Sequence, residues 1–258
     1  MMIDILTNNF VSFLLIFLRI IAMFFSAPIL SDNSIPVFVK IVLALFMSYV
    51  LLISLNINTP LASLNFTYLT ISALKEIIVG LAIGFFMQLI FWGISYGASL
   101  IGFDLGLSMA TVFNPNLEIS GDVVSTLFYI LAMLTFLLIN GHIFLFTALH
   151  ESFKLIPPTE LKISDSTAQE LIIQSANVFI IAVKIASPIM VTFFLMNIAE
   201  GIMSRIIPQM QVFFVLYPLR IGVGFLLITT TMIFFFYVIK ELLKLHETNL
   251  IKFIRVLG

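Results

Sequence analysis

The sequence predicts an all-α, multi-pass membrane protein with about five or six long, kinked apolar helices. Of the 258 residues, 61% are hydrophobic and only 10% are charged, whereas soluble domains average about 45–50% apolar and about 25% charged residues. Several apolar runs exceed the roughly 18 residues that can span a bilayer. The runs show no alternation typical of a barrel, and membrane-spanning backbone must satisfy its own hydrogen bonds, so helices are expected.

The apolar segments are expected in a fixed order along the chain. Their ends are marked by proline or by polar turns, such as SDNSIP after the first segment, NINTP after the second, and Pro157-Pro158 after the fourth. Proline cannot continue a helix because it lacks the backbone N–H. The six expected segments are Phe10–Leu30, Val37–Leu55, Leu69–Phe103, Val123–Leu149, Leu171–Ile202 and Val212–Ile239.

The third segment is too long for one straight span at 1.5 Å per residue. It contains a series of glycines, namely Gly80, Gly84, Gly93, Gly97 and Gly102. Glycines three or four residues apart let helix backbones approach closely in lipid. A bend or a close helix contact is therefore expected here.

The chain is expected to form a single helical membrane domain, residues 1–258. Residues 1–170 hold the N-terminal helices with a loop rich in Gly and Asn at 102–122, residues 171–240 form a helix pair, and residues 241–258 form an amphipathic tail. Four of the twelve basic residues lie at or beyond the end of the last segment: Lys240, Lys244, Lys252 and Arg255. Because basic residues favour the cytoplasmic side, the C-terminus is expected in the cytoplasm.

Charged side chains interrupt the apolar segments. Arg19, Lys184 and Arg220 lie within them, and Lys75-Glu76 and Glu200 lie nearer their ends. A charge at the bilayer centre costs roughly 2.5–3.5 kcal/mol on insertion scales. Two interpretations stay open. The side chains snorkel or pair within the fold, as Lys75 would with Glu76, or their segments are buried in a protein assembly or line a wet pathway.

Prolines favour the second interpretation. Pro28, Pro188 and Pro218 lie within or at the ends of apolar runs, and each frees a backbone carbonyl. At membrane depth such a break is tolerated where protein or water supplies the missing partner. Three breaks together with embedded charges indicate a chain that packs against other chains.

The parts of an enzyme are not found. The stretch YGASLIGFD has no nucleophile motif, and neither His142 nor His150 has an acidic partner placed to orient it. The sequence has no Walker-type loop or metal-ligand cluster, so no cofactor or metal is expected. A net charge of −1 argues against nucleic acid, and the chain has no cysteine.

Residues 102–122, GFDLGLSMATVFNPNLEISGD, are neither an apolar segment nor an ordinary linker. They carry the carboxylates Asp104, Glu118 and Asp122 but no basic residue. They also contain flexible glycine, an Asn-Pro pair, and bulky apolar side chains. This composition is unexpected for a purely connecting loop.

Two stretches carry a resemblance to the FliR family. The first is Ala186–Leu227, where the family has Arg, two residues, Pro-Gln, an aliphatic residue and Asn-Val-Phe. The matching residues are Arg205, Pro208, Gln209, Met210, Val212, Phe213 and, further on, Pro218. Gln211 replaces the usual Asn, and Leu216-Tyr217 replaces Gly-Phe before the proline.

The second stretch is FLLINGHIFLFTALHESFKLIP, from Phe136 to Pro157. It is similar to the family pattern through Phe136, Leu137, Gly141, His142, Ser152, Phe153 and Pro157. Upstream, Arg19 and Pro28 resemble the family's opening, and Glu76, Gly80 and Gly84 resemble its glycine-rich run. The Gly-His and Ser-Phe…Pro details favour the flagellar branch over the related injectisome branch.

The resemblance implies a non-enzymatic export-gate subunit of the flagellar type III secretion apparatus in the bacterial inner membrane. It implies a helical hetero-oligomer with FliP-like and FliQ-like gate subunits and contact with an FlhB-like switch protein. Unfolded flagellar proteins would pass through its pore. The family's loop after the glycine-rich helix acts as a plug, which here corresponds to residues 106–121 and includes Gly106, Leu107, Met109, Phe113, Asn114 and Pro115.

Two alternatives remain open. A secondary transporter for a small solute would use Arg19, Lys184, Glu200 and Arg220 as coupling or substrate groups. A passive membrane scaffold would tolerate mutation of the loop without change in conductance or secretion. The ordinary interpretation of residues 106–121 is a surface loop with a few apolar side chains.

Overall fold

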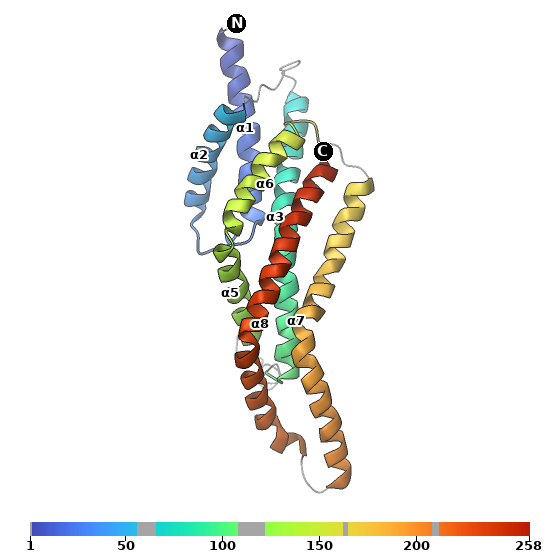
Figure 1. The fold of residues 1–258 in the computed structure, drawn as a ribbon. Helices are drawn as coiled ribbons and strands as arrows, with labels where there is room; N and C mark the ends of the chain where they lie inside the picture. Colours follow the sequence, from blue (N-terminus) through green and yellow to red (C-terminus); the bar gives the residue numbers. More distant parts are fainter. Residues whose placement is uncertain (1, 56–65, 108–121, 162–164, 208–211) are drawn as a thin grey trace. The chain divides into compact units, whose positions relative to one another are not determined.

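Long helices make up the structure, a computed structural model that describes residues 2–55, 66–107, 122–161, 165–207 and 212–258 (Figure 1). The helices are α1 (Met2–Ser26), α2 (Val37–Leu55), α3 (Phe66–Asp104), α5 (Val123–Leu138), α6 (Gly141–Leu155), α7 (Asp165–Ile206) and α8 (Val212–Leu257). Within the described residues, five helices are long and apolar enough to cross a membrane, or six if the broken pair α5 and α6 counts as one span. The prediction of a multi-pass helical membrane protein is confirmed.

Several segment ends differ from the prediction. The first helix is Met2–Ser26 and not Phe10–Leu30, and the fifth segment is Asp165–Ile206 and not Leu171–Ile202. The fourth and sixth segments differ most. The predicted segment Val123–Leu149 is two helices, broken where Asn140 adopts the left-handed conformation with φ 63°. Asparagine tolerates this conformation better than most residues, and an Asn-Gly pair is a turn signal. The last segment continues as one helix to Leu257, because the amphipathic pattern after Ile239 keeps the helical period.

The chain divides into two compact units. Unit 1 comprises Met1–Leu89, Asn140–Gln174 and Leu245–Gly258, and unit 2 comprises Ile90–Ile139 and Ser175–Lys244. In unit 1, α1 packs against α2 and Phe24 of α1 meets Phe146 of α6 edge to face, with ring centroids 6.2 Å apart. In unit 2, Phe91 of α3 packs on Phe136 of α5, and Phe128 of α5 packs on Phe235 of α8.

Glycines of α3 allow close helix contacts in both units, as the sequence predicts. In unit 1, a Cβ at Gly80 would overlap the carbonyl oxygen of Arg19, and one at Gly84 would overlap Ser26 and the backbone of α1. In unit 2, Gly93 and Gly97 face the backbone and side chains of α7 in the same way. At each of these positions the missing side chain of α3 lets the neighbouring helix approach closely.

Replacing Gly84 with alanine is expected to destabilise unit 1 by about 1–3 kcal/mol, because the methyl group must push α1 away from α3. Gly222 of α8 has open space where its Cβ would lie. The matched variant Gly222→Ala should therefore be neutral, or stabilising by up to about 1 kcal/mol through helix propensity. Thermal unfolding of the two purified variants compares them. Equal unfolding temperatures would contradict the close contact.

Candidate functional site

A buried ion pair lies between α1 and α3 in unit 1. Arg19 Nε donates to Glu76 Oε2 at 2.6 Å. The side chains of Arg19 and Glu76 are 0% and 1% exposed. A charge buried this deeply is tolerated only when it is paired and its remaining hydrogen-bonding atoms have partners.

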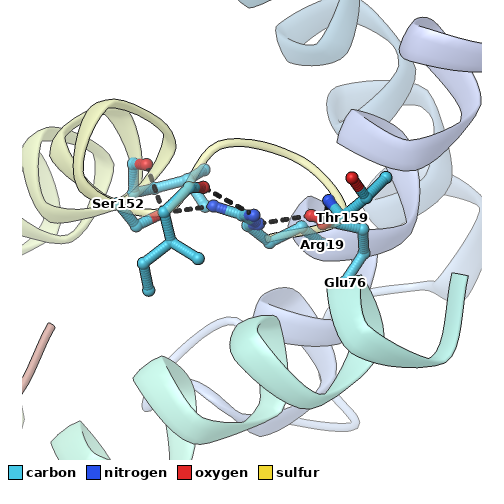
Figure 2. Close-up of polar contacts among 6 residues, drawn as sticks. Arg19, Glu76, Ser152 and Thr159 are labelled. Atoms are coloured by element: carbon cyan, nitrogen blue, oxygen red, sulfur yellow. Dashed lines mark hydrogen bonds and ion pairs between the residues drawn. The ribbon is translucent and has the colours of Figure 1, made fainter. Parts of the chain in front are cut away.

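The remaining polar atoms of this pair also have partners (Figure 2). Arg19 Nη1 donates to Ser152 Oγ at 3.2 Å, and Nη2 donates to the Ile156 carbonyl oxygen at 3.0 Å. Glu76 Oε1 accepts from the backbone N–H of Thr159 at 3.0 Å. The guanidinium carbon also lies 4.1 Å from the ring centroid of Phe153, within cation–π distance.

This cluster, which we call the Arg19 cluster (Arg19, Glu76, Ser152, Phe153 and Thr159), joins α1, α3, α6 and the turn that follows α6. Four of its five residues belong to three separate stretches that carry the family resemblance. The pair between Lys75 and Glu76, which one of the two interpretations included, is not present. Instead, Lys75 Nζ donates to the Thr159 carbonyl oxygen at 2.9 Å, because neighbouring residues on a helix point in different directions.

Sequence reasoning missed a second buried polar residue of unit 1, His246. Its side chain is 5% exposed, one ring nitrogen lies 2.6 Å from the Phe86 carbonyl oxygen, and its ring stacks on Phe86 with centroids 4.7 Å apart. Phe86 also stacks on Phe253. The signal in the sequence was a histidine one helical turn after Leu242 and one before Leu250, on the apolar stripe of the tail.

An ion pair in unit 2 joins α7 and α8. Arg220 Nη2 donates to Glu200 Oε2 at 2.8 Å, and also to the side-chain oxygen of Asn197. The two charged side chains are 19% and 8% exposed. Both this pair and the pair in the Arg19 cluster agree with the interpretation in which embedded charges pair within the fold. Lys184, by contrast, is exposed on α7.

The first residues of the predicted plug loop are fixed to α8 within unit 2. The Tyr217 hydroxyl donates to the Gly106 carbonyl oxygen, and Leu105 packs against Gly224. Gly106 has φ 78°, which a glycine adopts without strain and which ends α3. Leu107 is half-buried. Met109, Phe113, Asn114 and Pro115 lie outside the described residues.

Asp122 begins α5 at the other end of the loop. Its side chain accepts from the Val124 N–H at 3.1 Å as the N-cap and lies directly against Gly102, where any Cβ would overlap the carboxylate. Burial raises the pKa of Asp122 above its usual range, against the opposing effect of the Val124 and Ser125 N–H groups. Both ends of the loop are therefore held by contacts near the end of α3.

Asp122→Ala is expected to lower the free energy of unfolding by about 1 kcal/mol, because the cap is lost, whereas Asp122→Asn keeps it.

Since the native pKa of Asp122 is raised, the carboxyl group favours the folded state below its ordinary pKa. That contribution is lost as the pH rises through the raised value. Across this pH range, the unfolding temperature of the parent chain should fall with rising pH relative to that of Asp122→Asn, which keeps every other titrating group. The same pH dependence in both would refute this assignment.

The other predicted assembly residues differ in burial, and some lie outside the described residues. Gly141 is buried at the start of α6 and His142 is exposed beside it. Arg205 and Pro218 are exposed on α7 and α8. Pro208, Gln209 and the side chain of Phe213 lie outside what the structure describes. The assembly roles of these residues stay predictions.

The ion pairs Arg19–Glu76 and Arg220–Glu200 make further hydrogen bonds to groups of the same chain. Such contacts suit a structural role more than proton transfer. No three His, Asp or Glu side chains gather as metal ligands in the described parts of the chain. Together with the apolar helices, these observations define a multi-pass helical membrane protein whose embedded charges are bonded inside its units, apart from exposed Lys184.

The chain belongs to the FliR family. The sequence profile described as "Bacterial export proteins, family 1" matches residues 10–245. The chain is 31% identical to the flagellar biosynthetic protein FliR of Escherichia coli (strain K12), over 83% of this chain and 82% of that protein. It is 28% identical to FliR of Bacillus subtilis (strain 168) over 96% of both chains, and 29% identical to FliR of Aquifex aeolicus (strain VF5) over 84% of both.

Proposed function

We propose that this chain is a non-enzymatic subunit of the flagellar export apparatus, which helps to form and plug the pore through which unfolded flagellar proteins cross the bacterial inner membrane. The observation that carries the proposal is similarity to flagellar FliR proteins along almost the whole chain, including 96% of both chains in one comparison. A similarity limited to one or two helices would support only a shared fold.

The lengths of the helices support an assembly. Within unit 2 alone, α7 runs from Ser175 to Ile206 and α8 from Val212 to Lys244, so at 1.5 Å per residue these parts are about 48 and 50 Å long. A bilayer core is only about 30 Å thick. Large apolar side chains are exposed along much of both helices, for example Ile172 and Ile206 of α7. Lipid tails cannot cover apolar surface over such a length, so we expect other protein subunits to pack against the rest of it.

The partners that we propose are FliP-like and FliQ-like gate subunits and an FlhB-like switch protein, at the base of the flagellum. The C-terminus would lie in the cytoplasm, where Lys240, Lys244, Lys252 and Arg255 satisfy the preference of basic residues for that side. We further propose that residues 106–121 plug the pore, with the family signature residues contributing to assembly.

The contacts of the charged side chains argue against the alternative of a secondary transporter. A coupling group has to exchange partners during transport. Arg19 and Glu76 are instead buried and hydrogen-bonded to each other, to α6 and to the turn after α6. Arg220 likewise bonds Glu200 and Asn197. These contacts favour a fixed framework.

Affinity purification of the tagged full-length chain from membranes tests the proposal. The expected result is a stable complex that also contains two other small membrane proteins of the gate type, with little folded chain outside it. A transporter would instead be recovered as a folded monomer or homo-oligomer that binds a solute. Recovery in that form would refute the proposed function.

A further inference from the structure

One ammonium group lies exposed on an apolar face of α7. Lys184 is exposed, and Ile180 and Val191, at helical spacing on the same face, are 52% and 59% exposed. Among the described residues, no carboxylate lies within ion-pair distance of Lys184. Arg19, Lys75 and Arg220 all have partners within their units, so Lys184 stands apart from the other embedded cations.

The backbone beside Lys184 adds polarity to the same place. Pro188 lies inside α7 and has no N–H to donate to the Lys184 carbonyl oxygen one turn before it. The Ser187 hydroxyl donates to that oxygen instead, at a long 3.3 Å. Lys184 and Ser187, three positions apart on α7, thus contribute polar groups to an otherwise apolar surface. These two residues are here called the Lys184 patch.

Lipid alone does not suit this surface. Within unit 2, exposed apolar side chains extend along α7 from Phe179 to Ile206, which is about 42 Å of helix against a hydrocarbon core of about 30 Å. If the core surrounds Lys184, its ammonium lies in lipid tails without a counter-ion. If Lys184 marks the edge of the core, apolar side chains such as Phe179 and Ile180 project beyond that edge. Either placement leaves part of this face to be covered by protein.

We infer that the Lys184 patch binds an aspartate or glutamate carboxylate of an apolar helix from a neighbouring subunit. This inference rests on the proposed function, since it needs an assembly. The carboxylate accepts hydrogen bonds from the ammonium, while the apolar side chains around it cover Ile180 and Val191. A single cation in an apolar face favours a partner helix that has an acidic residue opposite Lys184. A partner helix without that residue would bury the ammonium without a counter-ion.

The first test compares charge variants of the tagged chain in complex purification. Lys184→Glu places like charges together and is expected to reduce recovery of the complex by about tenfold or more. Lys184→Arg keeps the charge and should retain the complex, whereas Lys184→Met should give an intermediate loss. Lys252→Glu makes the same charge change at an exposed lysine of α8 and serves as the matched control, with recovery unchanged.

A charge swap then identifies the partner. In the Lys184→Glu background, each acid within an apolar helix of the co-purifying subunits is changed to lysine in turn. One swap is expected to restore the complex, which a chain that had merely misfolded would not do. The chain contains no cysteine, so Lys184→Cys and a cysteine at the restoring position should then form a disulfide between the two subunits on oxidation.

Full recovery of the Lys184→Glu complex would overturn the inference. So would a set of swaps in which none restores the complex while Lys184→Cys, in the assembled complex, reacts with a water-soluble thiol reagent. That second result would place the lysine at a lipid headgroup or in water. A parent chain that purifies without gate subunits would instead refute the proposed function itself, so the two failures are distinguishable.

Discussion

Arg19→Met is expected to lower the free energy of unfolding by about 3–5 kcal/mol, because it leaves the Glu76 carboxylate buried without its counter-ion. Glu76 is 1% exposed and cannot turn to water without opening the contact between α1 and α3. The substitution also removes the donors to Ser152 and to the Ile156 carbonyl oxygen. Denaturant or thermal unfolding of the purified complex measures the loss, with accumulation of the chain in membranes as a second readout.

The double variant Arg19→Met/Glu76→Gln separates the cost of an unpaired charge from the cost of lost packing. Glutamine is neutral and retains an oxygen that can accept from the Thr159 N–H. If the unpaired charge dominates, the double variant should recover a large part of the stability, since removing both charges is much less costly than removing one. A double variant as unstable as Arg19→Met alone would show that the charge is not the cause.

An exposed ion pair provides the matched control. Lys154 Nζ lies 2.9 Å from Glu151 Oε1, and these side chains are 51% and 40% exposed. Lys154→Met removes a lysine on the same helix, α6, that contributes Ser152 and Phe153 to the Arg19 cluster. Its effect should stay within about 1 kcal/mol, because water already solvates both charges.

The sequence identified the embedded charges but could not pair them correctly. Arg19 and Glu76 were conspicuous because each interrupts an apolar run, and both belong to stretches that resemble the family. Their contact joins positions 57 residues apart, and no local pattern encodes such a separation. The neighbouring Lys75 was the nearest basic residue in the sequence, yet helix geometry turns it away from Glu76 toward the Thr159 carbonyl oxygen.

Helix positions were more predictable than helix ends. Val37–Leu55 was predicted to the residue, because polar turns close both sides of a fully apolar run. The break at Asn140 was missed, since hydropathy continues through it. The end of α8 was missed for the opposite reason. Hydropathy falls after Ile239, but Leu250, Phe253 and Ile254 continue the helical stripe and are buried in unit 1.

Unit 2 places the two ends of the predicted plug loop close together. The Asp122 carboxylate lies against Gly102, one turn before Gly106, and the Gly106 carbonyl oxygen accepts from Tyr217. Three extended residues reach about 10 Å. A chain without residues 107–118 still has residues 119–121 to connect Gly106 with Asp122, so this deletion is expected to leave α3 and α5 in place.

Deleting residues 107–118 should raise ion conductance through the assembled gate severalfold, because Leu107, Met109 and Phe113 are the side chains proposed to block the pore by apolar contact and dewetting. Conductance of the reconstituted complex, or permeability of the inner membrane in cells, measures the leak. The matched variant exchanges residues 107–118 for glycine and serine at constant length. If apolar side chains form the seal, it should leak as the deletion does. Unchanged conductance in a complex that contains every subunit would leave these residues as an ordinary surface loop, and the pore would have to be closed elsewhere.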